Sequence, residues 1–272
     1  MIVNLPSFLV NRGTQIYRKT LLRRRQLFLR SVVATIGFTA FIASGVNCCC
    51  QSSRTDGLQL PDTNALWRIV QTAECSPESR SCFERNNAKG YVVIKDRDGV
   101  NQLLLLPTAQ IAGIDDPNLS SVDTVNLFAM AWESRKWSHA LAALPPDRLS
   151  LALNSYVSRT QDQLHIHIDC VDKDVHKSLE GLWTAISYQW QPIPRELKGH
   201  KYYARRIDNL NAESPLALLR SIGMTKEDIG RWTLVVVGAP AKQPGFVILA
   251  DRADGEKDRA WGEELQDHNC MQ

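Results

Sequence analysis

The segment QLHIHIDC, residues 163–170, places two histidines and an aspartate at alternate positions among aliphatic residues. In an extended strand, side chains two residues apart point to the same face of a sheet. His165, His167 and Asp169 therefore share one face, and the isoleucines between them share the other. The chain has only 6 histidines. Two adjacent imidazoles indicate a site that binds a metal ion or a phosphate, or that supplies a nucleophile.

The elements that must position this strand follow from apolar periodicity and turn residues. The stretch KGYVVIKDRDGVNQLLLLP predicts a hairpin, LSLALNSY and QLHIHIDC predict two further strands, and WTLVVVGAP and GFVILADR predict a late hairpin. Residues 124–144 and 174–190 have helical periodicity. Hairpins with interspersed helices predict an α+β fold, with an antiparallel sheet and flanking helices.

The N-terminal region is predicted to meet a membrane. The first thirty residues hold seven Arg and Lys and no Asp or Glu, and residues 31–46 carry no charge. This pattern predicts a basic cytoplasmic tail (1–26), a transmembrane helix (27–47), a linker (48–62) and a catalytic domain (63–272). An uncleaved signal anchor is preferred, and a cleaved secretory signal is the alternative. The predicted location is the bacterial inner membrane, single-pass, with the catalytic domain in the periplasm.

Cysteine usage agrees with export. Cys75, Cys82, Cys170 and Cys270 form an even set after the linker, which permits three connectivities. We prefer Cys75–Cys82 with Cys170–Cys270, because the first pair brackets a short polar loop and an oxidising compartment favours disulfides. Four free thiols are the alternative. The net charge of +3 gives no sign of nucleic-acid binding, and 44% hydrophobic residues are enough for a core.

The residues around the histidine strand resemble the histidine-triad (HIT) superfamily. NSYVSRTQDQLHIHID is similar to that family's active-site strand, His-φ-His-φ-His-φ-φ with φ apolar. The family has a Gln four residues before the first His, where this chain has Gln161, and an Asn on the neighbouring strand, where it has Asn154. NQLLLLPTAQIAGIDD is similar to a second HIT segment, with Gln102 in place of an additional His.

Further segments resemble one membrane-bound branch of the HIT-like fold, the bacterial CDP-diacylglycerol pyrophosphatases. These segments are GYVVIKD, LHIHI, GHKYYARR and QDHNC, together with the predicted N-terminal anchor. The resemblance extends from roughly Asn64 to the C-terminus. It implies hydrolysis of the membrane lipid CDP-diacylglycerol to CMP and phosphatidate, with no cofactor and no metal ion.

The resemblance also implies roles for the residues of the strand. The middle triad position falls on His167, which would attack the α-phosphorus and form a cytidylyl-histidine, with His165 as a supporting donor. The third position holds Asp169 instead of His, which would orient His167 or pair with a cation. The register Gln163-His165-His167, with His165 central, stays open. The first register is preferred because it alone places the family's Asn and Gln.

Two groups of residues are predicted to bind the substrate. Asn154 would orient the nucleophile, while Gln161 and Gln102 occupy family positions near the phosphates. The segment KGHKYYARR offers charges that would neutralise a pyrophosphate, with Tyr202 or Tyr203 stacking on cytosine; the charged residues are His200, Lys201, Arg205 and Arg206. An amphipathic surface segment is the alternative interpretation of this stretch. His139, His176 and His268 stand in polar stretches and are predicted at the surface.

Three other functions compete with this interpretation. His165, His167 and Asp169 could serve as ligands in a metal-dependent hydrolase, since His-x-His on a strand is a known metal signature. A broader nucleotide pyrophosphate hydrolase is the second alternative. The third is a non-catalytic, membrane-tethered binding protein in which the departures from the HIT pattern mark a lost activity.

Overall fold

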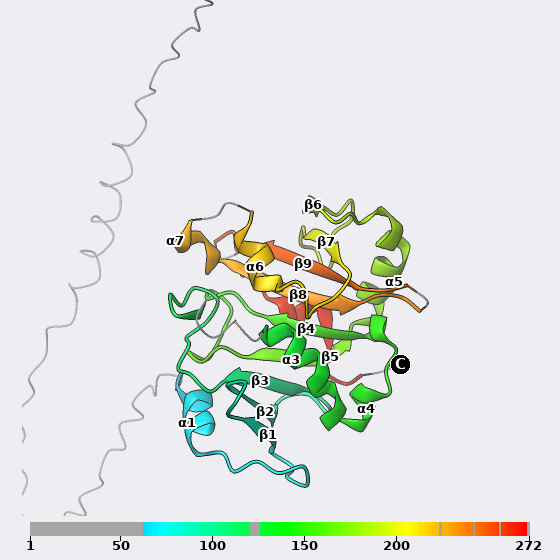
Figure 1. Ribbon diagram of the computed structural model, residues 1–272. Helices are drawn as coiled ribbons and strands as arrows, with labels where there is room; N and C mark the ends of the chain where they lie inside the picture. The colour runs from blue at the N-terminus through cyan, green and yellow to red at the C-terminus, as the bar shows by residue number, and fades with distance from the viewer. Residues whose placement is uncertain (1–61, 120–125, 223–224, 242, 256, 271–272) are drawn as a thin grey trace, which may run out of the picture. The chain divides into compact units, whose positions relative to one another are not determined.

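The computed structural model describes residues 62–119, 126–222, 225–241, 243–255 and 257–270. They build one sheet in which every pairing is antiparallel. Across the sheet the order is β1 (Cys82–Asn86), β2 (Tyr91–Lys95), β3 (Leu103–Pro107), β5 (Ile166–Val171), β4 (Leu149–Leu153), β8 (Trp232–Gly238), β9 (Phe246–Arg252), β7 (Tyr203–Ile207) and β6 (Gln191–Pro192) (Figure 1). A short strand, β10 (Gln266–Asp267), pairs with β5 off this path.

The described helices are short. The α-helices are α1 (Ala65–Thr72), α3 (Leu127–Ser134), α4 (His139–Ala142), α5 (Lys173–Leu182), α6 (Pro215–Arg220) and α7 (Lys226–Ile229). The 3-10 turns are η2 (Arg135–Trp137), η3 (Pro146–Arg148), η4 (Trp183–Ala185) and η5 (Gly262–Leu265).

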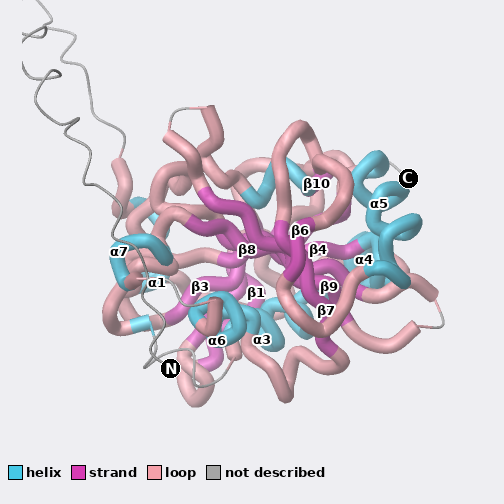
Figure 2. The backbone as a smooth tube through the Cα atoms, turned by 90° about the horizontal axis from the view of Figure 1, so that it is seen from above, coloured by secondary structure: helices cyan, strands magenta, loops and turns pink. Residues whose placement is uncertain are grey.

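One face of the sheet is covered continuously by apolar side chains. Leu105 of β3 and Ile166 and Ile168 of β5 point to this face and belong to one buried cluster with Phe128 of α3 and Leu216 of α6. Figure 2 shows α3 and α6 on one side of the strands and β10 on the other. Each such buried side chain contributes about 1.5–3 kcal/mol by leaving water, so this face fixes the position of β5.

The opposite face is covered by two separate clusters. Val70 of α1 packs with Leu104 in the first, over β1 to β3, and Leu179 of α5 packs with Ala152 in the second, over β4, β8 and β9. On β5, His167 pairs with Leu104 on one side and with Ala152 on the other. The polar face of the histidine strand therefore lies at the junction between the two apolar clusters.

The segment after β9 returns to this junction. η5 lies against β8, where a Cβ on Gly262 would come within 2.5 Å of Thr233 Oγ1, so only glycine permits this approach. β10 then pairs with β5, and a disulfide joins Cys170 to Cys270. A cross-link between residues 100 positions apart contributes about 5 kcal/mol in the chain-entropy model. The C-terminal segment is thus fixed beside the histidines.

Several predicted elements are confirmed. β2 pairs with β3 and β8 pairs with β9 as the two predicted hairpins, and β4 and β5 are the two predicted strands. Both preferred disulfides are present, Cys75–Cys82 and Cys170–Cys270. The predicted helix over 124–144 is interrupted, because Ser138 accepts a hydrogen bond from the Leu141 backbone and starts a new helix, α4.

The predicted fold class and location are wrong in other respects. The sheet dominates the described residues, and α5, with 10 residues, is the longest helix there. None of the described helices has the length and apolar character needed to cross a membrane, so the predicted spanning helix, membrane anchoring and inner-membrane location find no support in the described residues. The uncharged run is itself shorter than the about 20 residues such a helix needs. The predicted tail, anchor and nearly all of the linker lie outside the described residues.

Candidate active site

A pocket of about 890 Å³ lies at the junction between the two apolar clusters. Its apolar wall comes from α1, β2 and β3, and consists of Ala65, Leu66, Ile69, Ile94 and Leu104. The other walls are polar. They contain His167 of β5 and His165, which directly precedes β5. The further polar residues include Asn154, Gln161, His200, Lys257, Arg259, Trp261, Glu263, Glu264 and His268. One apolar wall opposite charged walls suits an amphipathic ligand.

His165 is held as a neutral imidazole. Its Nδ1 lies 2.7 Å from the backbone carbonyl of Gln163, so Nδ1 carries a proton and donates it to that oxygen. Burial and the charge of His167 together lower the pKa of His165 to about 4. The neutral ring keeps a lone pair on Nε2, and the residue lines the pocket. His165 therefore has the protonation state of a nucleophile.

His167 is in the opposite state. Its Nδ1 lies 2.9 Å from a carboxylate oxygen of Glu263 and 3.6 Å from Asp96. Burial alone would lower the pKa of His167, but the charge of Glu263 and the hydrogen bonds to Asp96 and Glu263 outweigh it and raise the pKa to about 9. Nε2 is fully buried without a hydrogen-bond partner among the described residues. His167 is thus a cation at neutral pH, with its ring centroid 4.7 Å from that of His165.

Glu263 is fixed by two close donors besides His167, and Gln102 Nε2 donates to its other oxygen at 3.5 Å. Asn154 Nδ2 donates to its carboxylate at 2.7 Å, and the Trp261 indole donates to the same oxygen at 2.8 Å. Burial by itself would raise the pKa of Glu263, but the charge of His167 and these hydrogen bonds hold it well below its usual range. Asn154, predicted to orient the nucleophile, instead holds the counter-charge of His167.

Gln102 lies behind the histidines, at the end of the loop before β3. Its amide nitrogen is 2.9 Å from His167 Nδ1, and its buried Oε1 has no partner among the described residues. An amide turned over would place this oxygen against the Nδ1 proton and would give up the 3.5 Å hydrogen bond from Nε2 to Glu263. Gln102 therefore contacts His167 and does not line the pocket.

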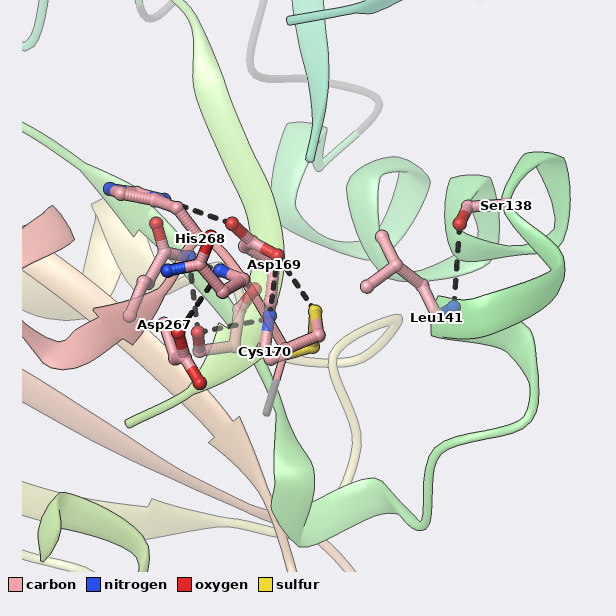
Figure 3. The surroundings of a disulfide bond; sticks show 10 residues. Ser138, Leu141, Asp169, Cys170, Asp267 and His268 are labelled. Carbon is pink, nitrogen blue, oxygen red and sulfur yellow. Dashed lines mark hydrogen bonds and ion pairs between the residues drawn. A yellow bond between two sulfur atoms is a disulfide. The ribbon is translucent and has the colours of Figure 1, made fainter. Parts of the chain in front are cut away.

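Asp169 holds a different histidine from the predicted one. Its carboxylate is fully buried and accepts from the Cys170 backbone at 2.8 Å and from His268 Nδ1 at 3.0 Å (Figure 3). The hydrogen bond to Asp169 raises the pKa of His268, which lines the pocket. The prediction of His268 as an isolated surface residue is wrong, because the Cys170–Cys270 disulfide and β10 bring it to the site.

Asp169→Asn is expected to raise KM by about tenfold and to change kcat less, because His268 loses the anion that favours its protonated form. Steady-state hydrolysis at several pH values measures the split between kcat and KM. Asp147→Asn, which breaks a similar pair with His176 at 2.9 Å outside this pocket, is the matched control. Unchanged KM in Asp169→Asn would show that His268 does not contact the ligand.

Gln161 lines the pocket but is engaged with α1. Its Oε1 accepts from the Leu66 backbone at 3.1 Å, and its Nε2 donates to the Asp62 carbonyl at 2.9 Å. These bonds hold the first turn of the helix that forms the apolar wall. Gln161 was predicted to lie near a phosphate, but its amide lies against the backbone at the start of α1.

Gln161→Ala is expected to loosen α1 by about 1 kcal/mol, since one of the two lost hydrogen bonds is to a backbone amide of α1 itself and such a bond contributes about that amount. Hydrogen exchange of the α1 amides should become about fivefold faster, while exchange in β5 stays unchanged. Gln191→Ala is the matched control, because Gln191 also bonds a backbone carbonyl, that of Ala185 at 2.7 Å. Equal exchange in α1 for both variants would refute this role.

The second predicted binding segment reaches the pocket at one residue only. Among the described residues, His200 lines the pocket, whereas Lys201, Arg205 and Arg206 do not. Arg205 pairs with Glu213 at 3.6 Å, and Arg206 lies 4.8 Å over the Trp183 ring.

The two tyrosines predicted to stack on cytosine do not line the pocket either. Tyr202 is fully buried and its hydroxyl donates to Glu264, and Tyr203 packs on Trp232. The lysines and arginines that line the pocket are Lys95, Arg97, Lys257 and Arg259.

His165, His167 and Asp169, the metal ligands of the alternative hydrolase, do not come together as a metal site. Among the described residues, the clusters with metal-ligand spacing do not combine Asp169 with His165 and His167. One of them groups Asp169 with Cys170 and Cys270, whose sulfurs are joined in a disulfide. The other contains His200, at the edge of the pocket.

Comparisons with known proteins agree with the resemblance seen in the sequence. A family model described as CDP-diacylglycerol pyrophosphatase matches residues 61–272. A CDP-diacylglycerol pyrophosphatase of Yersinia pestis is 40% identical over 226 residues, which cover 79% of this chain and 86% of the relative.

Proposed function

Because the chain belongs to the CDP-diacylglycerol pyrophosphatase family, we propose that it hydrolyses CDP-diacylglycerol through a covalent intermediate on a pocket histidine. The reaction class, hydrolysis of a phosphoric anhydride, follows from the family. The covalent intermediate and the residue that carries it are our proposal. The likeness to the HIT superfamily stays a prediction.

The geometry favours the register that the sequence left open. The 2.7 Å contact between His165 Nδ1 and the Gln163 carbonyl leaves Nε2 unprotonated, and the lowered pKa keeps the ring neutral. A neutral imidazole is a nucleophile, whereas an imidazolium is not. His167, the residue preferred from the sequence, is held as a cation by Glu263. His165 is therefore the proposed nucleophile, and His167 the proposed acid.

The proposed reaction has two steps. In the first, His165 Nε2 forms a bond to the α-phosphorus, the P–O bond to phosphatidate breaks, and His167 gives a proton to the departing oxygen. In the second, water attacks the same phosphorus, its proton passes to the now neutral His167, and the P–N bond breaks. CMP and phosphatidate are the products, and His165 is restored.

The walls of the pocket suggest how the lipid lies. The apolar wall formed by Leu66, Ile69 and Leu104 suits the diacylglycerol part, and Lys257 and Arg259 oppose it with positive charge. Trp261 lines the pocket with 45% of its surface exposed and offers a face for cytosine. A broader nucleotide pyrophosphate hydrolase would not need the apolar wall. A much higher KM for CDP-glycerol than for CDP-diacylglycerol is therefore expected.

Hydrolysis in ¹⁸O-labelled water tests the proposal. Attack at the α-phosphorus places the label in CMP, and attack at the other phosphorus places it in phosphatidate. In a parallel reaction, substrate labelled in its cytidylyl phosphate is quenched in alkali, where a phosphoramidate survives, and the labelled peptide is identified. Label in CMP and on His165 is expected. Label in phosphatidate, or an unlabelled protein during turnover, would refute the covalent route, and no CMP at all would favour a binding protein.

A further inference from the structure

A second cluster of polar side chains lies beside the pocket. It consists of His200 from the turn before β7, Asp251 from β9 and Asp258 from the segment that follows β9. One ring nitrogen and one oxygen of each carboxylate lie within 4.8 Å of one another. His200 also lines the pocket, so the cluster and the pocket share a residue.

Asp251 is buried with one oxygen unsatisfied. Asp251 is only 5% exposed, and its Oδ1 accepts a hydrogen bond from the Arg252 backbone amide at 2.7 Å. Its Oδ2 is fully buried and has no donor among the described residues; the side chain within hydrogen-bonding reach of Asp251 is another carboxyl group, that of Asp258. A buried carboxylate oxygen without a donor is costly, so such an atom indicates a missing positive partner.

Asp258 adds negative charge beside Asp251, and His200 adds a positive charge that offsets it in part. Burial and then the charge of Asp258 raise the pKa of Asp251 to about 6, so the two carboxylates oppose each other at neutral pH. Three neighbouring cationic side chains are engaged elsewhere: Lys198 pairs with Asp172 at 2.7 Å, Arg252 pairs with Asp228, and Arg259 donates to the Val157 carbonyl, whereas Lys257 lines the pocket. A cation from solution would therefore compensate the pair.

His200 is oriented in the way that metal ligands often are. Its Nδ1 lies 2.8 Å from a Glu264 carboxylate oxygen, and the same oxygen accepts from the buried Tyr202 hydroxyl at 2.7 Å. A carboxylate behind a histidine fixes the ring and raises its basicity, and this arrangement accompanies histidine ligands in many metalloproteins.

We propose that His200, Asp251 and Asp258 bind a divalent cation at the edge of the pocket. One imidazole nitrogen and two carboxylate oxygens suit Mn²⁺ or Mg²⁺, and three protein ligands leave positions for water or a phosphate oxygen. The proposal concerns binding by this cluster and does not depend on the covalent route proposed above.

Binding of Mn²⁺ to the full chain tests the proposal without substrate. Electron paramagnetic resonance, which detects free Mn²⁺, should show one saturable site in the wild type. Asp251→Asn and Asp258→Asn should each weaken binding at least about tenfold. Asp254→Asn is the matched control, because Asp254 is an exposed carboxylate of the same segment outside the cluster; it should bind as the wild type does. Addition of Mn²⁺ should raise the melting temperature of the wild type and of Asp254→Asn only.

Two results would overturn the proposal. One is an absence of saturable Mn²⁺ binding up to millimolar concentrations, and the other is equal weakening of binding by Asp254→Asn. Circular dichroism shows whether the buried Asp251→Asn variant folds; if it does not, the partly exposed His200→Gln and Asp258→Asn decide. Absent binding combined with a higher melting temperature of Asp251→Asn at pH 7 would mean that the two aspartates share a proton instead.

Discussion

Replacing His165 with alanine is expected to lower kcat for CDP-diacylglycerol hydrolysis by at least about 10⁴-fold, the size of effect seen when a covalent nucleophile is removed. The variant loses the only neutral imidazole nitrogen that the proposed mechanism places at the α-phosphorus. The fold should survive, because the apolar face of β5 is carried by Ile166 and Ile168 and is unchanged. Single-turnover assays with cytidine-labelled substrate should also show no labelled protein.

Two further variants make this result specific. His167→Ala should lower kcat by about 10²–10³-fold and still form labelled protein, since it removes the acid but leaves the nucleophile. His139→Ala, at an exposed site outside the pocket, should be fully active. Labelled protein in His165→Ala, or label on His167 in the wild type, would return the nucleophile to the register preferred from the sequence.

Glu263→Gln is expected to move the alkaline limb of the pH–rate profile to lower pH. The proposed acid works only when protonated, so wild-type activity should hold at neutral pH and fall as the pH rises through about 9, the pKa of His167. Without the charge of Glu263, the pKa of His167 returns toward its ordinary value of about 6.5. At pH 8 the variant should be slower by about 10–100-fold, and the loss should shrink at pH 6.

The same substitution has a stability signature. A pKa raised in the folded state stabilises the fold fully below the unfolded value of about 6.5, and this contribution is lost as the pH rises through about 9. Glu263→Gln should therefore lower the melting temperature more at pH 6 than at pH 10. Asp96→Asn, at 3.6 Å from His167, should shift both profiles in the same direction by less. An alkaline limb that stays in place in Glu263→Gln would refute His167 as the acid.

The parts of the fold that the sequence predicts are those encoded locally. Alternation in QLHIHIDC places the histidines on one face, and the hairpins follow from apolar runs around turn residues. The spacing of Cys75 and Cys82 in a short loop made their disulfide predictable. Asn154 was found through the resemblance to the HIT family; it directly follows β4, the strand next to the histidines, although its hydrogen bond goes to Glu263.

The rest of the site depends on tertiary contacts that no local pattern reports. Glu263 and His268 lie in an irregular segment, and only its docking on β5 and β8 brings them to the pocket. Asp96 was assigned to the turn of a hairpin and not to a site. Arg205 and Arg206 resemble phosphate ligands in sequence, but they lie on β7 against Trp190 and Trp183. A cluster of arginines in the sequence does not show whether the side chains line a ligand pocket or stack on tryptophan rings.

The late position of the C-terminal segment has a consequence during protein synthesis. His268 meets Asp169 across 99 residues of chain, and Glu263 meets His167 over a similar span. A ribosome-bound nascent chain that ends before η5 already contains the nucleophile, but its second histidine lacks the carboxylate that keeps it protonated. Such a chain, or the product of a premature stop codon in this region, also lacks β10 and the Cys170–Cys270 disulfide that hold His268 at the pocket, and should be catalytically silent. Activity toward the lipid thus begins only once translation has passed η5 and β10, so a fragment released early cannot consume the substrate.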